Sequence, residues 1–367
     1  MKGQHRMRIA FFGSSLVSAY WNGAATYYRG IIRELHRLDY RITFYEPDAY
    51  GRQQHRDIVD PPWARVVVYA ADDEGLAAAL DDARHADLIV KASGVGVFDE
   101  ALEAAVLQIK RPGAAAAFWD VDAPATLDRV QQSPDDAFRA LVPRYDFIFT
   151  YGGGDPVVTA YTLLGARHCI PIYNALDPAT HYPVALDTRF SGDLGFIGNR
   201  LPDREARVKE FFIDVARRLP RCRFLLGGNG WEPPLPGNIT YLGHVYTHEH
   251  NAFNSTPRAV LNINRESMAR YGFSPPTRVF EAAGAGACLI TDAWEGIELF
   301  LEPGREVLVA RSGEEVAEQL LSLTVDRAAG IGEAALKRIT AEHTYAHRAR
   351  QLHAVLDAPA GRAGGCA

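Results

Sequence analysis

Glu281 is the only charged residue in the apolar stretch 279–291, VFEAAGAGACLIT. A carboxylate buried in apolar surroundings is costly unless a cation or hydrogen-bond donors pair with it. Two kinds of partner fit the sequence: the guanidinium of Arg278, three residues earlier, or a pair of hydroxyl groups on a ligand. The sequence therefore predicts that Glu281 either forms a structural ion pair or binds a ligand.

Arg200 and Arg204 lie on either side of the expected start of a helix over residues 203–219. Guanidinium groups and the free backbone N–H groups of a helix start suit the oxygens of a phosphate. Two arginines on a solvated helix end would have the same spacing, so a phosphate site and a plain surface both fit this motif.

Two further strand ends in the same half carry candidate ligand contacts. Gly228 belongs to a run of glycines after residues 223–227, where a ligand could approach the backbone closely. His244 and Val245 follow the strand expected over residues 239–243. An ordinary turn and a loop histidine are the alternatives for these two places.

Asp120 and Asp122 follow the strand expected over residues 114–119. One of them could act as the general base that takes a proton from a substrate hydroxyl. The alternative for Asp122 is to cap the helix that starts at Ala123-Pro124. Small and aromatic residues at neighbouring strand ends would line the same place: Ser14, Asn22, Gly23, Tyr151 and Gly153, with Tyr20 and Trp21 either stacking on a ligand ring or packing.

Strand-like and helix-like segments alternate along the chain, which is typical of parallel sheets covered by helices on both faces. In the first half we expect strands at 8–12, 41–46, 65–69, 87–91, 114–119 and 146–150, and helices at 25–38, 74–84, 99–109 and 155–164. In the second half we expect strands at 193–197, 223–227, 239–243, 259–263, 288–291 and 306–310, and helices at 203–219 and 274–283. Each half is thus expected to be a doubly wound α/β domain, with ligands at the carboxyl ends of its strands.

The segments between and after these elements are expected to be irregular. Residues 170–191 have three prolines and no clean period, which indicates a linker. Residues 267–273 are expected to form a loop, and Ser274 is expected to cap the helix whose first turn holds Pro275 and Pro276. Residues 357–367 are expected to be disordered.

Composition limits the classes of function. The chain has 367 residues, a formal net charge of −6 and 47% hydrophobic residues, which fits two globular domains rather than one. Scattered charges favour neither nucleic acid nor an anionic membrane as partner. The four cysteines lack paired spacing, which argues against a zinc site or a disulfide framework. With no apparent signal peptide, we expect a cytoplasmic protein without a membrane segment.

The second half resembles the C-terminal half of GT-B glycosyltransferases of group 1. The segment EAAGAGACLI matches that family's helix and strand, and Glu295-Gly296-Ile297-Glu298 matches its later loop. The resemblance implies that Glu281 binds the donor ribose and that Arg204, with Arg200 nearby, holds the donor diphosphate. It also implies that no metal or other cofactor is required.

One position departs from that family. Many retaining members have two glutamates separated by seven residues, and the earlier position here is Phe273. The resemblance leaves the sugar to be seated by the loops that contain Ser267, Gly272, Phe273 and Ser274 and by Glu295 and Glu298. Whether the anomeric centre is retained or inverted stays open.

A closer likeness is to the CgeB-like glycosyltransferases. It covers residues 267–310 and extends to WNGAATYYRGIIREL, FWDVDAPATL, FTYGGGD and AEHTYAHRARQL, in that order. The likeness implies a GT-B fold, an acceptor domain over 1–185, a donor domain over 186–342 and a cleft between them. It also implies that the helix 343–356 packs back on the first domain.

The implied activity is transfer of a hexose-type sugar from a nucleoside diphosphate donor, with UDP expected, to an acceptor that is a small molecule, a glycan or a protein. Two alternatives remain at this stage. One is a GT-B nucleotide-sugar epimerase, and the other is a nucleotide-sugar-binding protein without catalysis, for which the missing glutamate would be the sign.

Overall fold

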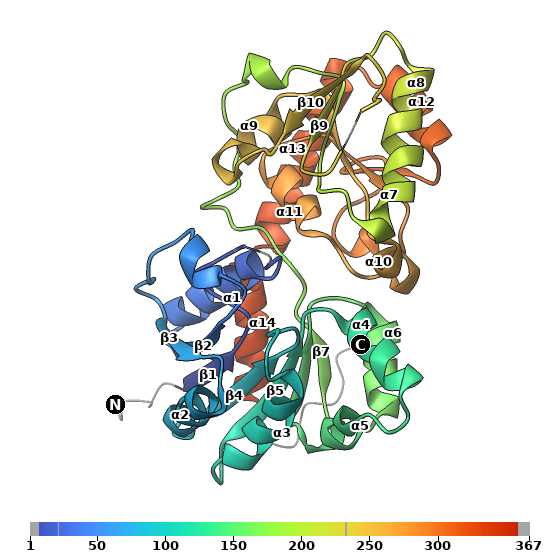
Figure 1. Cartoon of the computed structure of the whole chain (residues 1–367). Coiled ribbons are helices and arrows are strands. Elements are labelled where there is room, and N and C mark those ends of the chain that lie inside the picture. Colours follow the sequence, from blue (N-terminus) through green and yellow to red (C-terminus); the bar gives the residue numbers. More distant parts are fainter. Residues whose placement is uncertain (1–6, 21, 232, 359–367) are drawn as a thin grey trace. The chain divides into compact units, whose positions relative to one another are not determined.

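The computed structural model describes residues 7–358 except 21 and 232 (Figure 1). The described chain forms two compact units. The first comprises the residues up to Tyr173 together with the segment that begins at Tyr345, and the second comprises Asn174–Thr344. The prediction for Trp21 and most of the expected disordered tail lie outside the described residues.

The first unit is built on a seven-stranded parallel sheet with the order β3-β2-β1-β4-β5-β6-β7. Its strands are β1 (Arg8–Phe12), β2 (Arg41–Asp48), β3 (Arg65–Ala70), β4 (Leu88–Ala92), β5 (Ala115–Asp120), β6 (Phe147–Thr150) and β7 (Cys169–Pro171). The first six occupy the expected positions, and their order is that of a Rossmann-like domain. The expectation that the linker starts at residue 170 was wrong, because the three residues of β7 pair with β6 at the sheet edge.

The helices of the first unit are α1 (Ala25–Arg37), α2 (Asp73–Ala83), α3 (Asp99–Ile109), α4 (Ala123–Gln132), α5 (Ala137–Leu141), α6 (Gly154–Leu163) and α14 (Tyr345–Asp357). The C-terminal helix α14, red in Figure 1, packs against α1 of the N-terminal segment. Gly30 makes this approach possible, because a Cβ at that position would lie 2.2 Å from the ring of Tyr345. Tyr345 in turn packs edge-on against Tyr27.

The second unit is built on a six-stranded parallel sheet with the order β10-β9-β8-β11-β12-β13. Its strands are β8 (Leu194–Ile197), β9 (Phe224–Gly227), β10 (Ile239–Gly243), β11 (Ala259–Asn262), β12 (Leu289–Asp292) and β13 (Leu308–Ala310). Its helices are α7 (Pro202–Val208), α8 (Asp214–Arg218), α9 (His250–Ser255), α10 (Glu266–Tyr271), α11 (Thr277–Gly284), α12 (Gly313–Ser322) and α13 (Val325–Glu342). All six expected strands are present, and a π-helical turn, Lys209–Ile213, joins α7 to α8 within the expected helix 203–219.

Two local expectations in the second unit were wrong. Helix α11 begins at Thr277 rather than at Ser274, and no side chain caps it. The reason is steric, because a residue before proline is kept out of the α region, and this applies to both Ser274 and Pro275. Residues 267–273 are not a loop throughout, since α10 ends at Tyr271 and Gly272 follows it with a φ of 68°.

Residues 174–185, which the sequence assigned to the first domain, belong to the second compact unit. Leu176 donates its backbone N–H to the carbonyl of His343 at 2.8 Å. A Cβ on Gly284 of α11 would lie 2.3 Å from Leu176. The linker segment is thus packed against α11 and the end of α13. No described helix is long and apolar enough to cross a lipid bilayer.

Replacement of Tyr345 by alanine is expected to destabilise the first unit by about 3–5 kcal/mol, because a large buried aromatic side chain leaves a cavity. Urea unfolding followed by tryptophan fluorescence measures the change, with exposed Arg350→Ala on the same helix as control. Equal stability of the two variants would contradict the packing of α14 described above.

Candidate functional site

Three glycines bring the carboxyl ends of β8, β9 and β10 unusually close together. Gly228 donates its N–H to the carbonyl of Gly243 at 2.7 Å. A Cβ on Gly228, whose φ is 112°, would lie 2.3 Å from the carbonyl oxygen of Gly198. Only glycine fits this place, so the predicted close approach at Gly228 is here made by the chain's own backbone.

Arg204, on α7, lies beside this strand end with fewer partners than a guanidinium needs. Its Nη2 donates to the carbonyl of Asn199 at 2.6 Å, and its charge lies 5.8 Å from the centre of the Phe196 ring. Its Nε is buried and has no hydrogen-bond partner. Desolvation, followed by the charge of Arg278, lowers the pKa of Arg204 to about 10.

Arg278, in the first turn of α11, lacks partners in the same way. It makes no hydrogen bond and no ion pair with any residue in the described ranges. Burial lowers the pKa of its guanidinium, and the charge of Glu281 partly offsets that effect. Arg204 and Arg278 therefore present two partly desolvated positive charges that repel each other, and an anion would stabilise both.

Arg200 differs from these two arginines. Its Nη2 forms an ion pair with Glu205 at 2.8 Å, and 42% of its side-chain surface is exposed. An exposed pair of this kind contributes roughly 0–1 kcal/mol. The structure therefore places Arg200 on the surface beside the predicted phosphate site, whereas Arg204 and Arg278 carry the desolvated charge.

Glu281 is half-buried and, within the described part of the chain, its carboxylate accepts no hydrogen bond and joins no ion pair. The alternative in which Arg278 forms a structural ion pair with it is therefore not what the structure shows. One oxygen of Glu281 and one ring nitrogen each of His181 and His250 lie within 4.8 Å of one another. Burial lowers the pKa of His250, and the charge of Glu281 opposes that shift.

Sequence reasoning treated Arg278 only as a partner of Glu281 and did not single out His181 or His250. A signal for Arg278 was present, because residues three apart on a helix share one face. For the histidines there was none, since His181 lies in the linker and His250 opens α9, 100 and 31 residues before Glu281 in the sequence.

The two loops expected to seat the sugar interlock. Phe273, at φ 47°, donates its N–H to the carbonyl of Glu295 at 2.6 Å. A Cβ on Gly296 would lie 2.4 Å from the Phe273 ring, and one on Gly272 would lie 2.9 Å from the Cβ of Glu295. Phe273 thus joins the two loops through its backbone and its ring.

The remaining predicted residues of this half lie around these loops. Ser267 donates to Asp203 at 3.3 Å, and Ser274 is buried. Glu295 and Glu298 line an open groove of about 980 Å³ with Arg311 and Arg327. The described lining of this groove includes neither Arg204 nor Glu281.

His244 and Val245 follow β10 as expected. His244 is exposed and packs edge-on against Tyr246 at 4.7 Å. The carbonyl of Val245 accepts a hydrogen bond from Nε2 of His250 at 3.2 Å. This bond links the segment after β10 to the cluster around Glu281.

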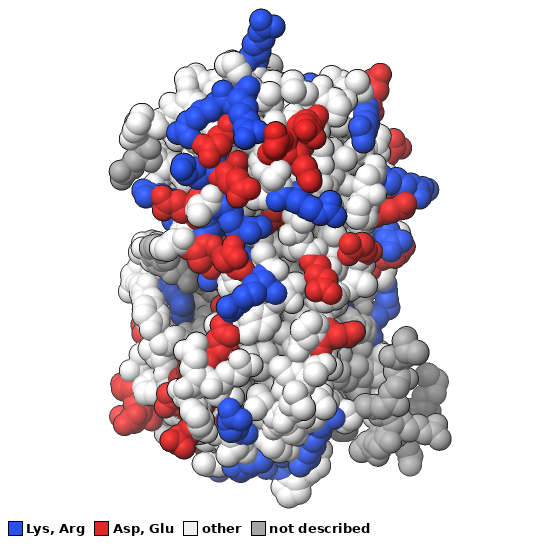
Figure 2. Space-filling view, turned by 90° about the vertical axis from the view of Figure 1, so that its right-hand side faces the viewer, with Lys and Arg blue, Asp and Glu red and all other residues white. Residues whose placement is uncertain are grey.

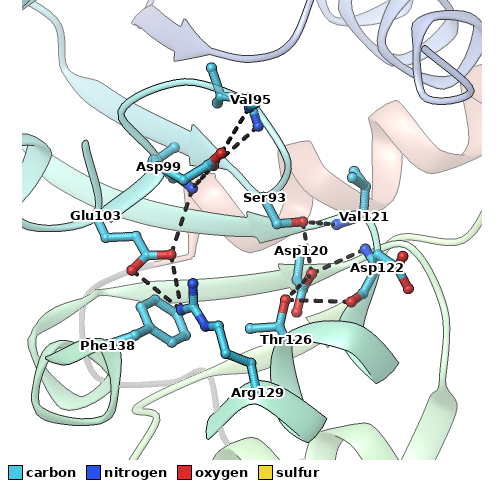
Figure 3. A network of polar contacts seen from close by, with 12 residues as sticks. Ser93, Val95, Asp99, Glu103, Asp120, Val121, Asp122, Thr126, Arg129 and Phe138 are labelled. Atoms are coloured by element: carbon cyan, nitrogen blue, oxygen red, sulfur yellow. Dashed lines mark hydrogen bonds and ion pairs between the residues drawn. The ribbon is translucent and has the colours of Figure 1, made fainter. Parts of the chain in front are cut away.

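Asp120, at the end of β5 in the first unit, is fully buried (Figure 3). Its Oδ1 accepts from Ser93 at 2.8 Å, from Thr126 at 3.0 Å and from the N–H of Asp122 at 3.1 Å. Its Oδ2 accepts from Tyr161 at 2.5 Å. Burial raises the pKa of Asp120, and these donors oppose the shift. An enclosed carboxylate with four donors has the surroundings of a structural group rather than of a base open to a substrate.

Asp122 is partly exposed and precedes α4, but its side chain does not cap that helix. The other predicted acceptor residues are largely enclosed. Ser14 donates to Asn22 at 2.8 Å, and the amide of Asn22 donates to the carbonyl of Ser15 at 2.7 Å. Gly23 is exposed, Tyr151 is partly exposed and Gly153 is buried at the start of α6. Tyr20 stacks on His55, with ring centres 4.0 Å apart.

Comparison with solved structures identifies the architecture. Sucrose-phosphate synthase from Thermosynechococcus elongatus superposes with a TM-score of 0.69 at 14% identity, over 96% of this chain and 98% of that one. HepE of Anabaena, in complex with UDP and glucose, superposes with a TM-score of 0.68 at 16% identity, over 96% and 100%. The chain has the GT-B fold. An α-glucosyltransferase bound to UDP and a 13-mer DNA has the same GT-B architecture, with a TM-score of 0.65 at 11% identity over 96% and 100%.

Residues 204–354 of this GT-B chain match the model of a family described as glycosyl transferase-like. The match begins at Arg204 and includes α11, and hence Arg278 and Glu281. No curated protein matches the chain in sequence.

Replacement of Asp120 tests the structural role assigned to it. Asp120→Asn keeps an acceptor for three of the donors and places an amide opposite Tyr161, whose oxygen can accept, so we expect the first unit to stay folded. Asp120→Ala leaves three buried hydroxyls without their acceptor and is expected to cost about 3 kcal/mol or more. Urea unfolding of the two variants measures the difference.

The pH dependence gives a second measurement on the same residue. Because the pKa of Asp120 is raised in the folded state, the folded chain holds its proton more tightly than the unfolded chain. The free energy of unfolding should therefore fall as pH rises from about 4 towards the raised pKa. Asp120→Asn should lose this part of the pH dependence. If the free energy of unfolding of Asp120→Asn changes with pH as that of the wild type does, the raised pKa of Asp120 is wrong.

Proposed function

We propose that this protein is a glycosyltransferase, of the CgeB-like kind, that moves a hexose-type sugar from a nucleoside diphosphate donor to an acceptor. The observation that carries the proposal is the pair of desolvated guanidinium groups, Arg204 and Arg278, neither of which forms an ion pair in the described chain. A diphosphate supplies two adjacent negative groups of the required sign. The GT-B fold and the match over residues 204–354 support a transferase.

In this proposal the two guanidinium groups act on the leaving group. When the bond between the sugar and the diphosphate breaks, negative charge grows on the phosphate oxygens. Fixed positive charges in a partly desolvated place stabilise that charge more than water does. Arg204 and Arg278 supply the charge that a divalent cation supplies in other enzymes, so we propose that transfer does not require a metal.

Glu281 would bind the other end of the donor. Its unpaired carboxylate can accept hydrogen bonds from the two hydroxyls of a ribose, and the backbone near His244 and Val245 would contact the base. UDP is the proposed nucleotide because the structure of HepE contains it. The loops joined at Phe273 and Glu295 would hold the sugar.

The first unit would supply the acceptor side. Asp122, partly exposed at the end of β5, is the better candidate for a general base than the enclosed Asp120. On the face shown in Figure 2, acidic and basic side chains alternate without a broad basic patch. This supports an acceptor other than nucleic acid, although the α-glucosyltransferase mentioned above was solved with DNA. The cytoplasm is the proposed compartment, since the described cysteines are all unpaired.

A thermal-shift screen of nucleotides tests the donor first, because a ligand that binds only the folded state raises the melting temperature. UDP is expected to raise it more than UMP or uridine does. Release of the sugar from a UDP-hexose, measured with EDTA present, then tests transfer. Binding without release on any acceptor would favour the non-catalytic alternative, and absence of any nucleotide effect would contradict the proposal.

Substitutions separate the two ends of the donor. Arg278→Met should weaken UDP about tenfold to a hundredfold, the roughly 1.5–3 kcal/mol of a charged hydrogen bond, and leave uridine binding nearly unchanged. Glu281→Ala should weaken UDP and uridine alike. Arg200→Met is the control, because that guanidinium is already paired with Glu205. Calorimetric titration of each folded variant gives the affinities, and equal effects of the two arginine substitutions would contradict the assignment.

A further inference from the structure

The cluster of His181, His250 and Glu281 has a property that the proposed function does not use. His181 lies in the linker, His250 opens α9 and Glu281 lies on α11. One potential ligand atom from each lies within 4.8 Å of the other two. Three separate segments of the second unit thus bring three metal-ligating side chains together.

The hydrogen bonds of the two histidines determine which nitrogens remain free. Nε2 of His250 is bonded to the carbonyl of Val245, which can only accept, so Nε2 carries the proton and Nδ1 has a lone pair. Thr180 donates its hydroxyl proton to the carbonyl of Asp177 at 3.2 Å. Its oxygen therefore accepts at 2.9 Å from Nδ1 of His181, and Nε2 of His181 keeps its lone pair.

Two imidazole lone pairs and one carboxylate are therefore the unpaired atoms of this cluster, and none of the three side chains donates to another within the described chain. A ribose brings two hydroxyl donors, which the two oxygens of Glu281 can take by themselves, and this leaves one nitrogen of each imidazole without a partner. A metal ion uses all three groups.

We propose that His181, His250 and Glu281 bind a divalent transition-metal ion of the Zn²⁺ class. Two imidazoles and a carboxylate are ligands that such ions prefer. Each ring's other nitrogen donates to an oxygen, as is typical of metal-binding histidines. Bonds of about 2.1 Å place ligand atoms roughly 3.4 Å apart in a tetrahedral site. Side-chain rotations that move the ligand atoms by about an ångström would therefore bring them to metal-binding distances.

The metal site also has a consequence for nucleotide binding, and this consequence rests on the proposed function. Glu281 cannot hold both a metal and the ribose hydroxyls, so metal and nucleotide should exclude each other. The ion would then inhibit donor binding rather than assist the transfer. The charge of Arg278 acts on Glu281 and His250, and it opposes a cation while it attracts the diphosphate.

The metal is tested on the full chain after removal of bound ions with a chelator. Calorimetric titration with Zn²⁺ should show one saturable site, and Co²⁺ should give the visible absorption of a tetrahedral complex. Mg²⁺, which prefers six oxygen ligands, should not bind. Absence of saturable Zn²⁺ binding by the wild-type chain overturns the proposal without use of any variant.

Variants identify the ligands. His181→Gln and His250→Gln should each weaken Zn²⁺ at least tenfold, whereas the exposed His248→Gln, two residues from His250, should not. Arg278→Met should strengthen Zn²⁺ and weaken UDP, since the two ligands have opposite charges. Binding that survives both cluster substitutions, or that His248→Gln weakens equally, overturns the assignment.

Competition between Zn²⁺ and UDP tests the metal site separately from the proposed donor site. Saturating Zn²⁺ should raise the apparent dissociation constant of UDP at least tenfold in the wild type and leave it unchanged in His181→Gln. If UDP binds equally well with and without Zn²⁺, exclusion is wrong. If no nucleotide binds at all, the proposed donor site is wrong, while the Zn²⁺ titration still decides the metal site.

Discussion

The main physical constraint on the second unit is that it holds two partly desolvated arginines that form no ion pair with any described residue. Arg204 and Arg278 are both partly desolvated, and the charge of Arg278 further destabilises the charged form of Arg204. Removing a charge from water costs several kcal/mol unless a partner compensates. Such an arrangement is stable in a folded chain only because the rest of the unit, with its core around Phe212, Leu226 and Ile290, supplies the difference.

The first unit shows the opposite treatment of a buried charge. Asp120 is more deeply buried than either arginine, yet both of its oxygens accept hydrogen bonds from well-placed donors. Lys91 is buried nearby, and its Nζ lies 2.7 Å from Asp99. Satisfied networks of this kind rigidify a fold. The contrast between Asp120, whose oxygens have donors, and the two arginines, which form no ion pair within the described ranges, separates a structural charge from the charges proposed to bind a ligand.

The sequence was sufficient to predict where most strands of the two sheets lie, but not to predict which residues the charged side chains contact. Twelve of the strands are short apolar runs bounded by turn residues, and such runs can be located from local pattern alone. The three-residue β7 has no such pattern, since Pro171 and its neighbours are only partly buried. The start of α11 was misplaced because Ser274 has the residue type of a cap, whereas the two prolines decide the backbone.

The candidate site residues also divide into those that local sequence reveals and those that only the fold reveals. Glu281 stands out locally as a lone charge in an apolar segment, and the structure leaves it unpaired. Arg200 and Arg204 are indistinguishable in the sequence, because only the fold shows that Glu205 neutralises one and that Phe196 and Asn199 enclose the other. His181 and His250 are joined to Glu281 only by tertiary packing, which no local pattern encodes.

The position of α11 adds a last argument for an anion. Because the prolines delay the helix to Thr277, Arg278 lies in its first turn, and no acidic residue shares that turn. The positive end of a helix dipole disfavours a cation there by about 0.3–1 kcal/mol. Desolvation, the charge of Arg204 and the helix dipole therefore all act against Arg278 in the free protein. The negative charge of a bound diphosphate would offset the cost of all three effects, whereas an apolar ligand would offset none.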